Sequence, residues 1–185
     1  MLSWGLRFHP WPRRLLTVGL WFGQRGTVLV GSALLAGVVA WRARAVEPVV
    51  RLIVAVVTLG IVVYGFKLGL ARNAPIGDAL GQRPGTGASF PSGHTANAVL
   101  LWGLAQFTAV RWNVAERLTA CIRVGRWLAP WVVSAVMILL DYHWVSDLIA
   151  GAAVGVALLW LTLLPAWARV SRLIDRRLTT RASTR

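Results

Sequence analysis

The sequence contains very little cysteine, lysine, histidine or acid. A single cysteine, Cys121, excludes an internal disulfide and any multi-cysteine metal site. The chain has six acidic residues against twenty basic ones, and Lys67 is the only lysine among the latter. Only three histidines occur, so the placement of each one is informative.

Apolar residues dominate the rest of the composition. They make up 57% of the chain, and the mean hydropathy is +0.63. Soluble domains have about 45–50% apolar residues even when glycine is counted, so the composition indicates an integral membrane protein. The length allows one domain, residues 1–185, with no separate soluble module.

The net charge of +14 is a value that a nucleic-acid-binding protein can also have. Here, however, the arginines lie between apolar runs and in the C-terminal tail. Eleven tryptophans suit the two interfaces of a membrane, where amphipathic rings collect. We therefore expect membrane lipids, and no nucleic acid, as partners.

Five apolar runs are candidates for crossing the bilayer, which takes roughly 20 apolar residues. The first and fourth are near the lower length limit, and the runs are residues 26–41, 52–66, 95–110, 127–140 and 144–167. The predicted fold is all-α, a polytopic membrane helix bundle of about five transmembrane helices with an N-terminal interfacial helix.

Three segments lie outside these runs. Residues 1–24 lack the cleavage site of a secretory signal, and their short apolar stretch predicts a helix over residues 15–22 in the interface. Residues 73–92 form a glycine- and proline-rich loop, and a loop of this length is usually functional or disordered. Residues 169–185 form a basic, polar tail that we expect to be frayed.

The basic residues also predict the orientation. With five spans, thirteen of them fall on one side of the membrane and seven, four in the N-terminal segment, on the other. The positive-inside rule places the first side in the cytoplasm. The C-terminal tail is then cytoplasmic and loop 73–92 faces outward, in what we expect to be a bacterial plasma membrane.

Two histidines, an aspartate and two basic residues are predicted to converge at the outer face. His94 begins one helix, His143 and Asp147 begin another, and Lys67 and Arg72 lie where the second helix meets the loop. Because His143 and Asp147 are four residues apart, they would share a helix face. A carboxylate on one imidazole nitrogen sets the tautomer and leaves the other nitrogen free to attack.

The remaining groups suit phosphoryl transfer. His94 is placed to protonate a leaving oxygen as general acid, and Lys67 and Arg72 would neutralise a phosphoryl group. The helix that follows the Pro-Ser-Gly turn at residues 91–93 offers N–H groups and a positive dipole end to an anion. The set predicts phosphoryl transfer through a phosphohistidine, with no metal and no other cofactor.

The order of these residues resembles the type 2 phosphatidic acid phosphatase (PAP2) superfamily of integral membrane lipid phosphatases. The matching motifs extend over about residues 67–155 and are Lys67, Pro91-Ser92-Gly93-His94 and His143-x-x-x-Asp147. The resemblance implies a bundle of usually six membrane helices with an outward-facing site. It also implies a role for each residue, with His143 as nucleophile, Asp147 as its orienting partner, His94 as general acid, and Lys67, Ser92 and Gly93 as phosphate-binding residues.

Two arginines of the family's motifs are absent from this chain. The first motif has an arginine where this chain has Ala74, and the third has a Ser-Arg pair where it has Val136 and Met137. Each lost charge-assisted hydrogen bond to a phosphate would cost about 1.5–3 kcal/mol. Arg72, two residues from Ala74, and Arg83 in the loop are candidate replacements.

The sequence therefore predicts a metal-independent lipid phosphatase. Its candidate substrates are phosphatidic acid, phosphatidylglycerol phosphate, and polyprenyl phosphates or diphosphates of the cell envelope. Two alternatives stay open. The missing arginines also suit a degenerate member that binds lipid phosphates without turnover, and ionisable groups in membrane helices suit a small channel or proton-coupled transporter. A transporter would spread such groups through the bilayer depth, whereas these cluster at one face.

Overall fold

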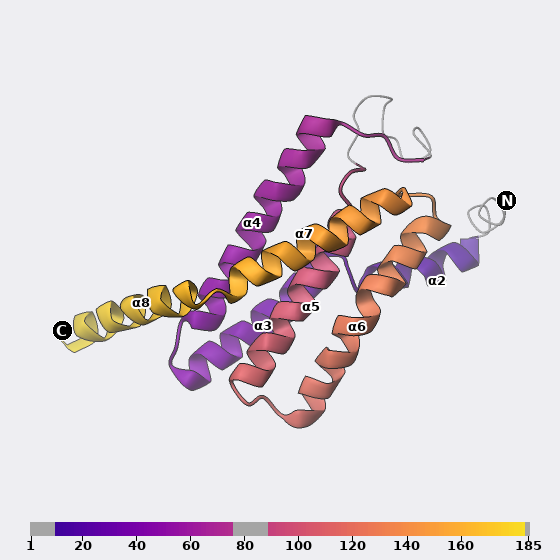
Figure 1. Cartoon of the computed structure of the whole chain (residues 1–185). Coiled ribbons are helices and arrows are strands. Elements are labelled where there is room, and N and C mark those ends of the chain that lie inside the picture. The colour runs from indigo at the N-terminus through magenta and orange to yellow at the C-terminus, as the bar shows by residue number, and fades with distance from the viewer. Residues whose placement is uncertain (1–9, 76–88, 184–185) are drawn as a thin grey trace.

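Within hydrocarbon, a helix satisfies its own backbone hydrogen bonds, and the chain is helical throughout its apolar runs. The computed structural model describes residues 10–75 and 89–183, and these segments contain helices and turns but no strand. In chain order the helices are α2 (Pro10–Leu20), α3 (Arg25–Ala43), α4 (Glu47–Leu70), α5 (Gly93–Arg111), α6 (Glu116–Leu139), α7 (Val145–Leu163) and α8 (Pro165–Ser183), as Figure 1 shows.

Helix α5 lies at the centre of the bundle, because α3, α4, α6 and α7 all pack against it. One apolar cluster joins α5 to α3, α4 and α7 through residues such as Leu59, Leu100 and Leu158. A second cluster joins α5 to α6 and includes Val133 and Met137. Burial of these side chains on several sides makes α5 the scaffold on which the ends of its neighbours are placed.

Two glycines of α7 let this helix approach α5 closely. A Cβ atom on Gly151 would lie 2.5 Å from the carbonyl oxygen of Ser92, and one on Gly155 would lie 2.9 Å from that of Ala96. No larger side chain fits at these distances, and small residues are a common means of close helix packing in membranes. The approach brings the start of α5 beside the start of α7.

Four of the helices, α3, α4, α6 and α7, are long and apolar enough to cross a membrane. The remaining predicted span, the third in chain order at residues 95–110, forms α5, which does not meet this criterion on composition because it carries polar residues such as Asn97 and Gln106. Its polar groups are tolerated because other helices surround it. The outer faces of the bundle are apolar, with exposed side chains such as Leu34, Ile61 and Trp160.

Helices α6 and α7 differ in their bounds from the predicted apolar runs. Helix α6 begins at Glu116, eleven residues before the predicted apolar run, because its first turns carry arginines that lower hydropathy without breaking a helix. Helix α7 ends at Leu163, because Pro165 lacks the N–H that would continue it.

The sequence predicted a frayed basic tail. In the structure this tail forms most of α8 instead. Pro165 occupies the first position of this helix, where a proline is favoured. The helix packs against α4, and the carboxylate of Asp175 accepts a hydrogen bond from the Val46 N–H at 3.1 Å. The prediction was wrong because it considered the charge of the segment and not its apolar residues at helical spacing, such as Val170, Leu173 and Ile174.

The N-terminal helix predicted over residues 15–22 is present as α2, which begins five residues earlier, at Pro10, and packs against α6. A Cβ atom on Gly19 would lie 3.0 Å from Val136, and one on Gly23, in the link to α3, would lie 2.7 Å from the carbonyl oxygen of His94. The α2–α3 link is thus in direct contact with the start of α5.

A buried arginine holds α4, α5 and α7 together at the end of the bundle where α4 begins and α7 ends. Arg51 is 3% exposed and forms an ion pair with Glu47 at 2.8 Å. Its guanidinium also donates to the carbonyl oxygens of Thr162 and, at 3.4 Å, Leu164, and it lies 5.1 Å from the Phe107 ring centroid. These bonds satisfy carbonyls at the C-terminal end of α7 that have no partner within the helix.

Candidate functional site

The predicted site residues meet at one end of the bundle, where α5 and α7 begin and α4 ends. The Ser92 N–H donates to the carbonyl oxygen of Asp147 at 2.9 Å, which ties the turn before α5 to the first turn of α7. This bond is possible because Gly151 lets the two backbones touch.

The central pair of the site is His143 and Asp147. The Nδ1 atom of His143 lies 3.4 Å from Oδ2 of Asp147, whose side chain is fully buried. The sequence predicted that both side chains lie on one helix face, but α7 begins at Val145 and His143 precedes it. The pair forms instead because Asp147 folds back over the helix start, where its carboxylate accepts the Trp144 N–H at 3.0 Å.

Ser89 completes this pair and was not predicted. It is 2% exposed, and its hydroxyl donates to Oδ2 of Asp147 and lies 3.3 Å from Nδ1 of His143. The Ser89 N–H donates to the Arg72 carbonyl oxygen at 3.0 Å, and this bond anchors the segment that leads into the Pro-Ser-Gly turn. A small polar residue three positions before Ser92 was the available signal in the sequence.

Arg72, a candidate replacement for a missing motif arginine, lies at the site and contacts the Asp147 carboxylate. One guanidinium nitrogen lies 2.9 Å from Oδ1 of Asp147 and donates to the Ser146 hydroxyl at 2.8 Å. The guanidinium also lies 5.7 Å from the Trp144 ring centroid. Because the Arg72 side chain is 40% exposed and a guanidinium has five donors, other N–H groups stay available to a ligand.

Lys67 and His94 lie near the central pair. The positive charge of Lys67, in the last turn of α4, is close enough to repel a positive charge on either His94 or His143. Arg25, at the start of α3, repels the positive charge of Lys67 in the same way. The Arg25 guanidinium lies 5.7 Å from the Tyr64 ring centroid. The sequence treated Arg25 only as one loop charge, because nothing local indicates that the start of α3 packs beside the end of α4.

The Pro-Ser-Gly turn positions the start of α5. Ser92 is fully buried, and its hydroxyl accepts the Thr95 N–H at 3.4 Å as the N-cap of the helix. The binding of phosphate by Ser92 stays a prediction, and the geometry gives its hydroxyl a capping partner. Gly93 begins the helix, and the first N–H groups of a helix have no partner within it.

The positions of the missing motif arginines are apolar and buried. Ala74 is 7% exposed, and Met137 is 1% exposed and packs with Ala98 and Val133. An arginine at position 137 would have to displace this cluster. Arg83, the second candidate replacement, lies outside the described residues.

Burial decides the charge of His143, which lies in the turn between α6 and α7. Burial lowers the pKa of His143 below its ordinary value, the hydrogen bond and charge of Asp147 oppose this shift, and the charge of Lys67 adds to it. The net direction favours the neutral imidazole at neutral pH, which is the nucleophilic form.

Among residues 10–75 and 89–183, no three histidine, cysteine or acidic side chains cluster as potential metal ligands. Metal independence stays a prediction.

Comparisons with known proteins support the resemblance seen in the motifs. The description "PAP2 superfamily" belongs to the family model that matches residues 48–171, about two thirds of the chain. A search of curated proteins finds no match. The crystal structure of a transmembrane PAP2 type phosphatidylglycerolphosphate phosphatase from Bacillus subtilis superposes with a TM-score of 0.70 at 20% identity, covering 87% of this chain and 80% of that chain. At this identity the likeness concerns the fold, which is that of an integral membrane protein, and together with the family match it shows that the chain belongs to the PAP2 superfamily.

Proposed function

We propose that the protein is a membrane lipid phosphatase that forms a phosphohistidine on His143. Membership of the PAP2 superfamily supports a lipid phosphatase in general terms. The observation that carries the finer proposal is the buried Asp147 carboxylate beside Nδ1 of His143. With Nδ1 as the donor to Asp147, Nε2 carries the lone pair that attacks phosphorus.

The reaction would then take two steps. In the first, Nε2 of His143 attacks phosphorus, a P–N bond forms, and the P–O bond to the lipid breaks while His94 gives its proton to the leaving oxygen. In the second, water gives a proton to His94 and attacks phosphorus, and the P–N bond breaks to release inorganic phosphate. A bound phosphate dianion favours the imidazolium form of His94 that the first step needs.

Cations from three elements would hold the phosphate. Lys67 from α4 and Arg25 from α3 repel each other, and a phosphate between them would relieve this repulsion. Arg72 approaches from the chain that follows α4. The first N–H groups of α5, at Gly93 and His94, add a positive helix end. Arg25 is our candidate for the charge that the family's third motif supplies, because position 137 is apolar and Arg25 enters from another helix.

The substrate would be a lipid carrying a phosphomonoester or diphosphate. Phosphatidic acid, phosphatidylglycerol phosphate and polyprenyl phosphates or diphosphates all present such a group at the membrane surface. The distribution of arginines supports an orientation in which the site faces outward and α8 is cytoplasmic.

A second candidate function is the binding of lipid phosphates without turnover. The apolar residues Ala74 and Met137 at two motif positions favour it. The intact contact between His143 and Asp147 favours the enzyme, because binding alone does not need an oriented imidazole.

Phosphate release separates the two candidates. The purified protein in detergent is given a panel of lipid phosphates and diphosphates, with and without EDTA, and released phosphate is measured. The matched control is Asp175→Asn, which changes a carboxylate in α8, away from the site. Release that survives EDTA and the control supports the enzyme. Tight binding of a panel member without release supports the binding protein instead.

A further inference from the structure

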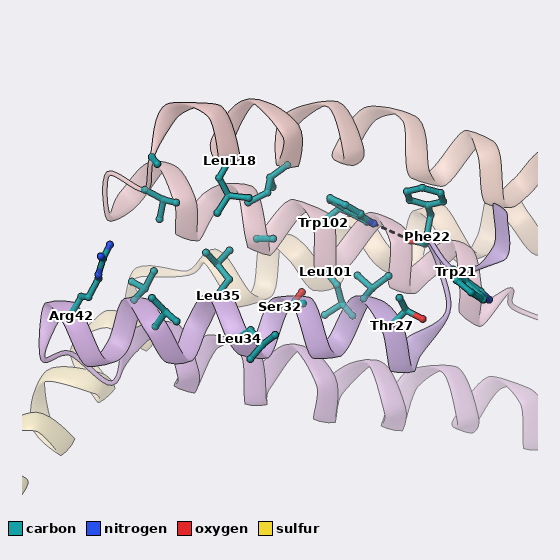
Figure 2. Close-up of a pocket in the computed structure, with 18 of the residues that line it drawn as sticks. Trp21, Phe22, Thr27, Ser32, Leu34, Leu35, Arg42, Leu101, Trp102 and Leu118 are labelled. Carbon is teal, nitrogen blue, oxygen red and sulfur yellow. Dashed lines mark hydrogen bonds between the residues drawn. The ribbon is translucent and has the colours of Figure 1, made fainter. Parts of the chain in front are cut away.

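An apolar groove runs along α3, separate from the His143 site. It has a volume of about 740 Å³ and is lined by α2, α3, α5 and α6. Its wall includes Leu35 of α3, Leu101 of α5 and Leu118 of α6. Leu34 and Leu118 are exposed, so the groove opens sideways between α3 and α6, two helices that can span the bilayer (Figure 2).

The length of the groove suits a lipid chain. Its lining extends along α3 from Thr27 to Arg42, which corresponds to roughly 22 Å of helix. One leaflet of the hydrocarbon core is about half of 30 Å thick. A hydrocarbon chain from one leaflet therefore fits lengthwise, and the volume lies in the range of ligand pockets, roughly 300–1,000 Å³.

The groove has a positive charge at one end. Arg42 lines it at the end of the bundle away from the His143 site, and Figure 2 shows Arg42 and the pair Trp21 and Phe22 at opposite ends. Arg42 is exposed, and no carboxylate of residues 10–75 and 89–183 forms an ion pair with it. A cation beside an apolar groove at a membrane surface is suited to an anionic headgroup.

The other end of the groove is closed by aromatic side chains. The Trp102 indole N–H donates to the Phe22 carbonyl oxygen at 2.9 Å, and the two rings stack with centroids 6.5 Å apart. Gly23 follows, with its backbone against His94 and Val133. None of the site residues lines the groove, so a chain that enters beside Arg42 ends at Phe22 and does not reach His143.

We propose that this groove binds one anionic phospholipid from the leaflet opposite the His143 site, with its phosphate on Arg42 and one acyl chain between α3 and α6. The lipid is a structural ligand and not a substrate, because its headgroup lies at the far end of the bundle from the nucleophile. It fills the space that α3 and α6 leave open where both pack on α5. The proposal does not depend on catalysis.

The test is native mass spectrometry of the protein in mild detergent with added phosphatidylglycerol or phosphatidylcholine. We expect wild type to retain one phosphatidylglycerol in preference to phosphatidylcholine, and Arg42→Gln to reduce this retention about fivefold, the effect of roughly one lost basic contact at a membrane surface. Arg44→Gln is the matched control, because Arg44 is an exposed arginine at the same end that does not line the groove. It should retain phosphatidylglycerol like wild type.

A second variant tests the apolar part of the groove. Leu35→Trp should fill the groove and abolish retention while Arg42 is intact, and Ala105→Leu serves the same purpose if the first variant does not fold. Equal losses in Arg42→Gln and Arg44→Gln, or equal retention of the two lipids, would overturn the proposal. A protein dimer that Leu35→Trp disrupts, with no bound lipid in wild type, would assign the groove to a second copy of the chain.

Discussion

The Asp147 carboxylate contacts His143, with Oδ2 3.4 Å from Nδ1 of the imidazole, and the Asp147 side chain is fully shielded from solvent. Three further groups converge on the same carboxylate: the Ser89 hydroxyl, the Trp144 N–H and the Arg72 guanidinium. The carboxylate therefore sets the orientation of the histidine and also joins loop, turn and helix. A substitution at Asp147 is therefore expected to affect both the rate and the stability of the fold.

Asp147→Asn should reduce turnover strongly. An amide cannot hold the imidazole in the same tautomer, and a buried carboxylate in such a pair contributes about 10²–10⁴-fold in rate. The measurement is kcat for phosphate release, beside a thermal unfolding scan of the same sample. Unchanged kcat in a folded variant would show that Asp147 does not orient the nucleophile.

Ser89→Ala should lower kcat by about tenfold or more, because a hydrogen bond to a charged group contributes roughly 1.5–3 kcal/mol. Ser89→Thr keeps the hydroxyl and should recover much of the rate. Ser171→Ala is a control, because this buried serine bonds a backbone carbonyl in α8. If Ser89→Ala changes only KM, the serine acts on the ligand and not through Asp147 and His143.

The rate should fall on the acid side below the ordinary histidine pKa of about 6.5. The pKa of His143 is lowered, mainly by burial, so its nucleophilic neutral form is lost only as the pH falls through that lowered value. The measurement is kcat/KM against pH, which reports groups of the free enzyme. An acid limb above pH 6.5 would contradict this assignment of the limb to His143.

Arg25→Gln and Lys67→Gln should each lower kcat/KM by about 10–100-fold, because each removes a charge-assisted contact of roughly 1.5–3 kcal/mol. Arg111→Gln, which removes an exposed arginine at the opposite end of the bundle, is the control and should behave like wild type. A normal kcat/KM in Arg25→Gln would leave Lys67 and Arg72 as the remaining phosphate-binding cations.

Arg51→Leu should destabilise the fold by about 3–5 kcal/mol, because breaking a buried ion pair leaves one charge without compensation. The change also leaves carbonyl groups of Thr162 and Leu164 without a donor. Thermal unfolding in detergent measures the effect, and the double variant Arg51→Leu with Glu47→Leu should recover part of it. An unfolding temperature equal to wild type would show that this arginine is not a structural link between α4 and α7.

The sequence was sufficient to predict the membrane fold and the end of the bundle at which the motif residues lie. His94, His143, Asp147, Lys67 and Arg72 all come to one end of the bundle, because successive helices run back and forth and return the chain to the same face. Scarcity also helped, since a chain with few histidines and acids leaves few candidates for chemistry at that face.

The rest depends on packing that local sequence does not encode. Arg25 comes near Lys67 because α3 and α4 lie side by side, and Ser89 reaches the site because Gly151 lets α5 touch α7. The His143–Asp147 contact forms at a helix start and not along a helix face, since a four-residue spacing is compatible with both. The helical tail was missed because charge conceals an amphipathic pattern when only hydropathy is considered.

The most direct test of the central claim is to trap the phosphoenzyme. The purified protein is mixed with a lipid phosphate that it hydrolyses, quenched within milliseconds in alkali, where phosphohistidine survives, and digested for mass spectrometry. The account predicts covalently bound phosphate on the peptide that contains His143. The His143→Ala variant should show neither bound phosphate nor phosphate release. Phosphate release by a folded His143→Ala variant, or covalently bound phosphate found only on another residue, would contradict the account.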